Sequence, residues 1–436
     1  MKEMPGFYIK THGCKVNQCD SEGLASRLES WGMAPTDDPR VASLCIVSTC
    51  TVTAVSDSKG LKAIRATRRA NPDAIIAVTG CLARRDRDKI LSTACVDEVL
   101  DIEDADGWLS FLTERGMVNG VPAPAATETP HPTGRTRAFV KVQDGCDSFC
   151  SYCVLPPIRG KPRSVPLEQV CDKVARLVEI GAKEVVLTGI HLGLYGKDIS
   201  SDVNLATLVQ TLLERTDIAR LRLSSIEVNE VTDELLALFG STTRMQRHFH
   251  VPLQSGDDAV LRSMNRHYTA DNFRDFIRRI RQVDADTGIS TDVMVGFPTE
   301  TEEAFETTLR LVEDLDFSRL HVFKYSPRPG TAAAKLEGGI PANVAKRRSD
   351  RMIELGARLS GQFAKRFVGK TLEVLIESKR DPQTGWLSGF ASNYVRVAVR
   401  DATADIVNTI AEVAVDDVAG AKATGTVQVG ARHASP

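Results

Sequence analysis

Short apolar runs alternate with longer polar stretches of helical periodicity over the first 118 residues. The apolar runs are FYIKTHG, LCIVSTC and AIIAVTGC, rich in the β-branched and aromatic side chains that favour strands. Between them lie DSEGLASRLESWG and SDSKGLKAIRATRRANP, which have the polar composition of surface helices. Because strands that alternate with helices form parallel sheets, residues 1–118 are predicted to be an open parallel-sheet α/β domain.

The same alternation continues, over more than 200 residues, from residue 137 to residue 365. Six strands are predicted, at RAFVKVQ, EVVLTGI, RLRLSSI, HFHVPLQ, ISTDVMVGF and RLHVFKY. Helical stretches such as LEQVCDKVARLVEIG and TADNFRDFIRRIRQVDADTG separate them. Six β/α units predict a full or partial barrel, with functional residues on the loops that follow the C-terminal ends of the strands.

Two further segments complete the predicted organisation. Residues 119–136, NGVPAPAATETPHPTGRT, lack periodicity and are rich in Pro, Thr, Ala and Gly, as linkers are. Residues 366–436 contain short β-rich runs with frequent turn signals, which predict a small antiparallel β-barrel. The chain is therefore expected to be α/β, with this barrel at its C-terminal end.

Composition narrows the class of protein. The chain has 436 residues, 42% of them hydrophobic and 26% charged, and no apolar run reaches the roughly 18 residues that a membrane helix needs. The first residues lack the apolar stretch of a secretory signal, so a cytoplasmic protein without a membrane partner is expected. A net charge of −2 gives no general affinity for nucleic acid, so any such surface must be local. In a reducing compartment, the ten cysteines favour metal binding or redox chemistry over disulfides.

The most specific motif is GCDSFCSYCVLP, in which Cys146, Cys150 and Cys153 follow the predicted strand RAFVKVQ with the spacing C-x3-C-x2-C. Three thiolates on one loop can hold three irons of a four-iron cluster. The fourth iron is then open to the amino and carboxylate groups of S-adenosylmethionine, whose one-electron cleavage yields a 5′-deoxyadenosyl radical. The alternatives are a zinc site with a remote fourth ligand and three buried core cysteines.

With this loop, the sequence resembles the radical SAM methylthiotransferases over nearly its whole length. The residues around the three cysteines that also match are Lys141, Asp144, Gly145, Pro156, Arg159, Gly160 and Arg163. GCKVNQ, CTVT and TGIHLG are most similar to the branch that modifies threonylcarbamoyladenosine beside the tRNA anticodon. The resemblance implies methylthiolation at C2 of that adenine, with two S-adenosylmethionine molecules used per transfer.

A second set of cysteines lies in the N-terminal block: Cys14 in THGCKVNQ, Cys50 in STCTVT and Cys81 in VTGCLA. Each follows a predicted parallel strand, where the loops of an open α/β sheet converge. From spacing alone, a shared cluster and ordinary buried cysteines both remain open. The resemblance implies an auxiliary cluster on these three cysteines, whose open iron holds the transferred sulfur, and hence two [4Fe-4S] clusters in all.

Several residues near the ends of the predicted barrel strands are candidates for binding S-adenosylmethionine. The resemblance implies that their segments line the cofactor and substrate pocket, although each residue taken singly is equally compatible with a structural loop role. Arg266, in RSMNRHYT, belongs to another matching segment and is expected near the same cavity. The candidates are Thr188, Gly189, His191, Ser225, Glu227, Gln254, Asp292, Gly296 and Pro298.

The resemblance also implies the partners. The C-terminal block resembles the TRAM-like RNA-binding barrel of tRNA modification enzymes, and its interleaved basic and aromatic residues suit single-stranded loops such as that of the anticodon stem-loop. These residues are Lys370, Lys379, Arg380, Arg396, Arg400, Trp386, Phe390 and Tyr394. A low-potential donor such as flavodoxin or ferredoxin is expected to reduce the clusters. Other substrates within the family are isopentenyladenosine in tRNA and an aspartate of a ribosomal protein. The alternative of another class is a non-enzymatic, zinc-dependent RNA-binding protein.

Overall fold

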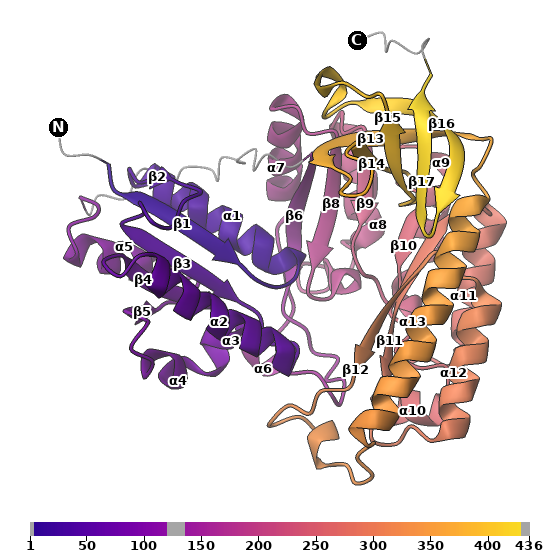
Figure 1. Cartoon of the computed structure of the whole chain (residues 1–436), viewed down its shortest axis with the longest axis horizontal. Coiled ribbons are helices and arrows are strands. Elements are labelled where there is room, and N and C mark those ends of the chain that lie inside the picture. Colours follow the sequence, from indigo (N-terminus) through magenta and orange to yellow (C-terminus); the bar gives the residue numbers. More distant parts are fainter. Residues whose placement is uncertain (1–3, 120–135, 429–436) are drawn as a thin grey trace. The chain divides into compact units, whose positions relative to one another are not determined.

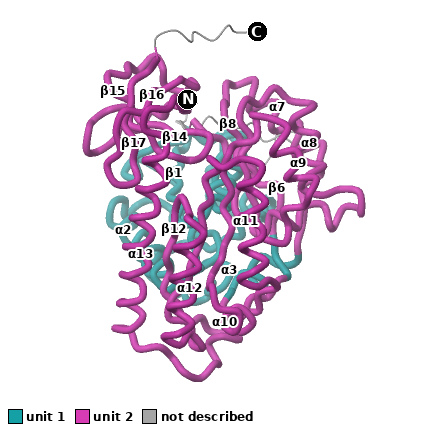
Figure 2. Tube along the Cα trace, turned by 90° about the vertical axis from the view of Figure 1, so that its right-hand side faces the viewer, with its two compact units in different colours: residues 1–133, 145–147, 153–161 teal, residues 134–144, 148–152, 162–436 magenta. Residues whose placement is uncertain are grey.

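The computed structural model describes residues 4–119 and 136–428 and forms two compact units (Figures 1 and 2). One unit contains residues 1–133 together with 145–147 and 153–161, and the other contains the rest of the chain. Residues 120–135 of the predicted linker lie outside the described residues. Two short pieces of the segment around Cys146 and Cys153 therefore belong to the same unit as the N-terminal block.

The N-terminal unit is built on a parallel sheet of order β2-β1-β3-β4-β5 (Figure 1). Alternate residues of β3, such as Ile46 and Val47, pack into separate hydrophobic clusters on opposite faces. Helices cover both faces, which is why the central strand β3 is buried along its whole length. The predicted open parallel sheet is confirmed. Its strands are β1 (Gly6–Thr11), β2 (Ala34–Pro35), β3 (Leu44–Thr49), β4 (Ile75–Gly80) and β5 (Glu98–Val99), and its helices are α1 (Lys15–Ser30), α2 (Ala54–Ala70), α3 (Cys81–Arg85), α4 (Arg87–Leu91) and α5 (Ala105–Glu114).

The second unit begins with a curled half-barrel, which contains all six predicted strands. Two sheets of order β7-β6-β8-β9 and β10-β11-β12 are joined by parallel β-bridges from Leu221 to Met245 and from Ser225 to His250. Every pairing within the sheets is parallel except that of the two-residue strand β7. The strands are β6 (Arg137–Asp144), β7 (Arg163–Ser164), β8 (Glu184–Gly189), β9 (Arg220–Leu223), β10 (His248–His250), β11 (Gly288–Val295) and β12 (Arg319–Lys324).

Helices pack against the outer face of this half-barrel. Val185 of β8 and Ile289 and Val293 of β11 join the main hydrophobic core with residues of the surrounding helices. Because side chains alternate along a strand, Ser290 and Asp292 point to the opposite, inner face. The helices with their bounds are α7 (Leu167–Glu179), α8 (Leu205–Arg215), α9 (Asp233–Ser241), α10 (Asp258–Ser263), α11 (Ala270–Val283), α12 (Glu302–Leu315) and α13 (Ala342–Lys365), with the 3-10 turns η1 (Leu192–Leu194), η2 (Val228–Glu230) and η3 (Ala333–Lys335).

The C-terminal block is a closed five-stranded barrel of order β13-β14-β15-β17-β16 (Figure 1). The predicted barrel is confirmed, but β15 pairs with β17 in parallel, so the barrel is mixed rather than wholly antiparallel. Phe363 and Phe367, at the end of α13 and just beyond it, fill its core. Its elements are β13 (Thr371–Arg380), β14 (Leu387–Ala391), β15 (Arg396–Arg400), η4 (Ala404–Ile406), β16 (Ile410–Ala419) and β17 (Lys422–Val427). Among the described residues, no helix is both long and apolar enough to cross a membrane.

The turn between β14 and β15 docks against the half-barrel, at the N-terminal ends of its strands. Tyr394 stacks on the His248 ring, with 4.5 Å between the centroids, and its hydroxyl accepts a 3.0 Å hydrogen bond from Arg137 Nη1. Phe390 stacks on Tyr394 in turn, at 4.7 Å. Two of the aromatic residues expected to face RNA therefore contribute to contacts within the protein.

Candidate functional site

The structure brings the thiols of Cys14, Cys50 and Cys81 together at the C-terminal edge of the N-terminal sheet. Cys14 follows β1 and caps α1, Cys50 follows β3, and Cys81 begins α3 directly after β4. Each thiol interacts electrostatically with another of the three. Cys50 and Cys81 are buried, whereas Cys14 is exposed, so the group is open to solvent on the Cys14 side.

Two glycines, each directly before one of these cysteines, permit this convergence. Gly13 has a φ of 128°, and a Cβ there would lie 2.9 Å from the Cβ of Cys50. Gly80 has a φ of 91°, and a Cβ there would lie 2.4 Å from the carbonyl oxygen of Thr49. Both positions require a residue without a side chain, because a left-handed backbone coincides with a close neighbour.

Asn17 lies between the thiols and was not singled out from the sequence. Its Oδ1 is 3.7 Å from Cys14 Sγ and 3.8 Å from Cys81 Sγ. Its Nδ2 donates 3.0 Å hydrogen bonds to the carbonyl oxygens of His12 and Thr49. The signal that could have found it is its spacing: a residue three positions after Cys14 on a helix faces the same side.

Arg159 completes the surroundings of these cysteines. It ends the short helix α6 (Leu155–Arg159), and its side chain is buried within the N-terminal unit. Its guanidinium pairs with Asp20 at 2.8 Å and donates to Asn17 Oδ1 at 2.9 Å and to Cys81 Sγ at 3.4 Å. Burial raises the pKa of the Cys81 thiol, and Arg159 opposes that rise.

The loop of Cys146, Cys150 and Cys153 has no regular secondary structure and is held by its neighbours. Cys146 N–H donates to Gly160 O at 3.1 Å, and a Cβ on Gly145, whose φ is 75°, would lie 2.1 Å from Lys161 O. Phe149, between the first two cysteines, has a φ of 45° and is 66% exposed. Such strain in a non-glycine residue marks a conformation imposed by its surroundings.

Arg266 contacts this loop within the second unit. Its Nη1 donates to Cys150 Sγ at 3.4 Å, and its Nη2 forms an ion pair with the Glu227 carboxylate. Burial raises the pKa of Glu227 even though Arg266 opposes the rise. The structure therefore places Arg266 and Glu227, both singled out from the sequence, beside the cysteine loop.

His191 also holds the cysteine loop. Its Nδ1 lies 3.0 Å from Ser148 Oγ, and its Nε2 lies 2.6 Å from Glu230 Oε1. Gly189 is explained by packing: a Cβ there would lie 2.9 Å from Gln143 Oε1, which accepts the backbone N–H of His191. These two candidates shape the end of β8 and the loop after it, and Thr188, within β8, is buried.

Most of the remaining candidates lie in the segments that follow β9, β10 and β11, and Asp292 lies on β11 itself. Gln254 adopts a φ of 62° and accepts the backbone N–H of Met294 on its own carbonyl oxygen. Gly296 has a φ of 76° and donates its N–H to buried Glu300, which pairs with Arg348 at 2.7 Å. Ser225 is exposed next to β10, and Pro298 is buried after β11.

A polar chain crosses the inner face of β10, β11 and β12. Ser290 Oγ lies 3.0 Å from His248 Nε2 and 2.9 Å from His250 Nδ1. Asp292 Oδ1 lies 3.3 Å from His250 Nε2 and 3.2 Å from His321 Nδ1. Burial opposes ionisation, but these imidazoles hold the pKa of Asp292 well below its usual range. Of these hydrogen-bonded residues, only Asp292 was singled out from the sequence.

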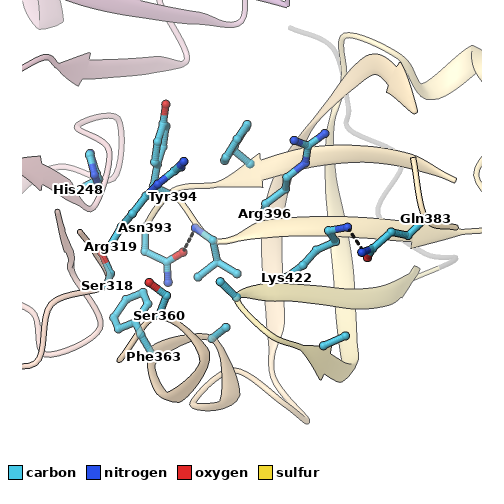
Figure 3. A pocket seen from close by; sticks show the side chains of 15 residues that line it. His248, Ser318, Arg319, Ser360, Phe363, Gln383, Asn393, Tyr394, Arg396 and Lys422 are labelled. Carbon is cyan, nitrogen blue, oxygen red and sulfur yellow. Dashed lines mark hydrogen bonds between the residues drawn. The ribbon is translucent and has the colours of Figure 1, made fainter. Parts of the chain in front are cut away.

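A cavity of about 480 Å³ lies at the other end of the same strands (Figure 3). His248, Arg319 and Tyr394 line it together with Arg396 and Lys422 of the C-terminal barrel. Lys422 donates to Gln383 at 3.1 Å and pairs with Asp381 at 2.5 Å. Because the cysteine loop follows the C-terminal end of β6, this cavity is remote from the candidate chemistry.

Known proteins match both parts of the chain. The radical SAM superfamily pattern matches residues 140–312, and that of the uncharacterized protein family UPF0004 matches residues 6–101. A threonylcarbamoyladenosine tRNA methylthiotransferase, MtaB, of Bacillus subtilis is 36% identical over 92% of each chain. A tRNA-2-methylthio-N(6)-dimethylallyladenosine synthase of Syntrophotalea carbinolica is 32% identical, covering 94% of this chain and 97% of its own. The chain belongs to the radical SAM methylthiotransferases.

As a radical SAM methylthiotransferase, the chain is an enzyme that acts on tRNA, and its family implies a four-iron cluster and S-adenosylmethionine. The donor set fits: three thiols on one loop leave one iron of such a cluster open. The structure of the radical S-adenosylmethionine methyltransferase TsrM from Kitasatospora setae shares the fold, with a TM-score of 0.53 and 16% identity over 74% of this chain and 73% of TsrM. The predicted family and enzyme class are confirmed.

Proposed function

We propose that the chain transfers a methylthio group to C2 of threonylcarbamoyladenosine beside the anticodon of tRNA. The observation that carries the proposal is the convergence of Cys14, Cys50 and Cys81, in addition to the cysteine loop after β6. Radical chemistry alone needs one cluster. A second group of three thiols supports a second cluster, on which the transferred sulfur is carried.

Cys146, Cys150 and Cys153 would hold the cluster that binds S-adenosylmethionine, and Cys14, Cys50 and Cys81 would hold the auxiliary one. When bound, the clusters and S-adenosylmethionine supply electrons, a carbon-centred radical and sulfur to an adenine C–H bond that acid–base groups cannot activate.

The chain's own residues orient these groups. Arg266 and His191 fix the cysteine loop through Cys150 and Ser148, and exposed Cys14 leaves the auxiliary group accessible to a large substrate. The electrons are expected from a low-potential protein of the flavodoxin or ferredoxin class.

The inner face of the half-barrel favours a polar substituent on the adenine. A threonylcarbamoyl group carries a carboxylate, a hydroxyl, a carbonyl and one N–H group, whereas an isopentenyl group is wholly apolar. The chain of His250, Asp292 and His321 offers donors and acceptors at mid-strand, and a buried polar group without a partner is costly. This lining supports threonylcarbamoyladenosine over isopentenyladenosine.

The test is nucleoside mass spectrometry on tRNA incubated anaerobically with the reconstituted, reduced full chain and S-adenosylmethionine. We expect a methylthio gain on threonylcarbamoyladenosine. Cys150→Ala should abolish both this gain and the release of 5′-deoxyadenosine. Cys81→Ala should abolish the gain while 5′-deoxyadenosine is still released, because only the sulfur-carrying site is removed.

Other outcomes would reassign the substrate or the class. A gain on isopentenyladenosine, or on an aspartate of a ribosomal protein, would overturn the proposed substrate and keep the chemistry. A colourless preparation that contains zinc and no sulfide would overturn the iron–sulfur assignment altogether.

A further inference from the structure

Arg159 brings a full positive charge into the interior of the N-terminal unit. Its side chain is 1% exposed, and that of its partner Asp20 is 3% exposed. A buried ion pair of this kind adds little stability compared with apolar residues of the same size, because both charges lose their hydration. Its position beside the thiols offers a different reason for the pair.

The guanidinium is directed at the cysteines. One nitrogen donates to Cys81 Sγ at 3.4 Å, and another donates to Asn17 Oδ1 at 2.9 Å, the oxygen that also contacts the thiols of Cys14 and Cys81. Hydrogen bonds to cluster sulfurs and nearby charges are among the main determinants of the reduction potential of an iron–sulfur cluster. A cation beside one ligand favours the reduced cluster, because reduction adds negative charge.

The same short segment also contacts the other set of cysteines. Arg159 is the last residue of α6, which begins two residues after Cys153. The carbonyl oxygen of the next residue, Gly160, accepts the backbone N–H of Cys146 at 3.1 Å. One segment within the N-terminal unit thus supports the backbone of the radical SAM loop and delivers a charge to Cys81.

We propose that Arg159 is a positioning residue that raises the reduction potential of the auxiliary cluster, with Asp20 moderating its charge. The inference rests on the proposed function, which assigns that cluster to Cys14, Cys50 and Cys81. It predicts shifts of opposite sign when the two members of the ion pair are neutralised, a pattern that a purely structural role does not produce.

The experiment is an anaerobic redox titration followed by electron paramagnetic resonance. It uses the full chain with Cys146, Cys150 and Cys153 changed to Ala, so that only the auxiliary cluster contributes. Arg159→Gln should make reduction at least tenfold less favourable, a shift of about 59 mV to more negative potential for one electron. Asp20→Asn should shift the potential to a more positive value. Arg159→Lys keeps the positive charge, so its potential should lie close to that of the parent protein.

Arg84→Gln is the matched control. Arg84 lies three residues after Cys81 on α3, but its charge is balanced by ion pairs with Asp101 and Glu103, so its loss should shift the potential much less than the loss of Arg159. Equal potentials in the Arg159→Gln and Arg84→Gln proteins would overturn the inference. If Arg159→Gln fails to retain iron, a shift in Asp20→Asn that is absent or negative would overturn it instead. A parent protein without about four irons and sulfides per chain would overturn the proposed auxiliary cluster itself.

Discussion

His321 is the most exposed member of the polar chain on the inner face of the half-barrel, with 41% of its side chain accessible. The proposed function assigns these polar side chains to the threonylcarbamoyl group. His321→Leu should therefore lower kcat/KM for threonylcarbamoyladenosine by roughly tenfold, since a lost polar contact costs about 1–2 kcal/mol. Competition between tRNAs bearing the two modified adenosines, read by mass spectrometry, measures the change. His267→Leu, an exposed histidine on the loop before α11, should leave the ratio unaltered, and equal discrimination in both variants would contradict the assignment.

The sequence allowed some single residues to be predicted and not others. Cys14, Cys50 and Cys81 could be grouped because each follows a parallel strand, and such strands end at one edge of the sheet. Gly189 was expected to bind S-adenosylmethionine, and that role stays a prediction, but its packing against the Gln143 side chain was not foreseen. That contact joins residues far apart in the sequence, and no local pattern encodes it. Arg159 was noted as a matching residue, yet its burial beside Cys81 depends on tertiary packing alone.

At the scale of secondary structure, the period-two and helical patterns predicted all six half-barrel strands and the barrel that follows them. The parallel β15–β17 pair was missed because turn spacing indicates hairpins between consecutive strands, not a pairing across an intervening one. Tyr394 was misleading for a related reason. An aromatic residue among basic ones resembles an RNA contact, but the turn before β15 inserts Tyr394 against His248 and Arg137.

The C-terminal barrel retains an exposed basic pair, at the end of β13, that suits RNA. Lys379 and Arg380, at the end of β13, are exposed, so Lys379→Ala/Arg380→Ala should weaken tRNA binding and lower the salt dependence of the affinity by one to two released counterions. Fluorescence anisotropy with an anticodon stem-loop at several salt concentrations measures both. Release of 5′-deoxyadenosine without tRNA should stay at the parent level. Lys370→Ala, which removes a lysine paired with Asp286 at the half-barrel, serves as the control. Equal losses in both variants would argue against RNA binding by Lys379 and Arg380.

At the scale of the whole molecule, a cluster of buried charges joins the half-barrel to the C-terminal barrel within the second unit. Arg222 pairs with Glu184 at 2.7 Å, with both side chains at most 1% exposed, and donates to Ser392 O at 3.0 Å. Arg220 donates to Glu373 O at 2.8 Å. Burial alone would raise the pKa of Glu184, but the arginines outweigh it and hold that pKa below its usual value. The ionised Glu184 carboxylate therefore holds Arg222 in the position from which it donates to the C-terminal barrel.

Arg222→Leu should consequently destabilise the second unit by about 3–5 kcal/mol, because it leaves the Glu184 carboxylate buried without its main partner. A Glu whose pKa is depressed in the folded state stabilises above its unfolded pKa, about 4.3, and this contribution is lost as the pH falls through the folded pKa. The parent protein should thus lose stability on acidification below about pH 4.3, and Glu184→Gln should lose less stability over the same pH range.

Arg215→Leu is the control for Arg222→Leu. It removes an arginine from an exposed pair with Glu168 and should cost at most about 1 kcal/mol of stability. Urea midpoints across this pH range, with limited proteolysis of the C-terminal barrel, measure the effect; a cost in Arg222→Leu no larger than in Arg215→Leu would mean that the two barrels are held together by their apolar contacts instead.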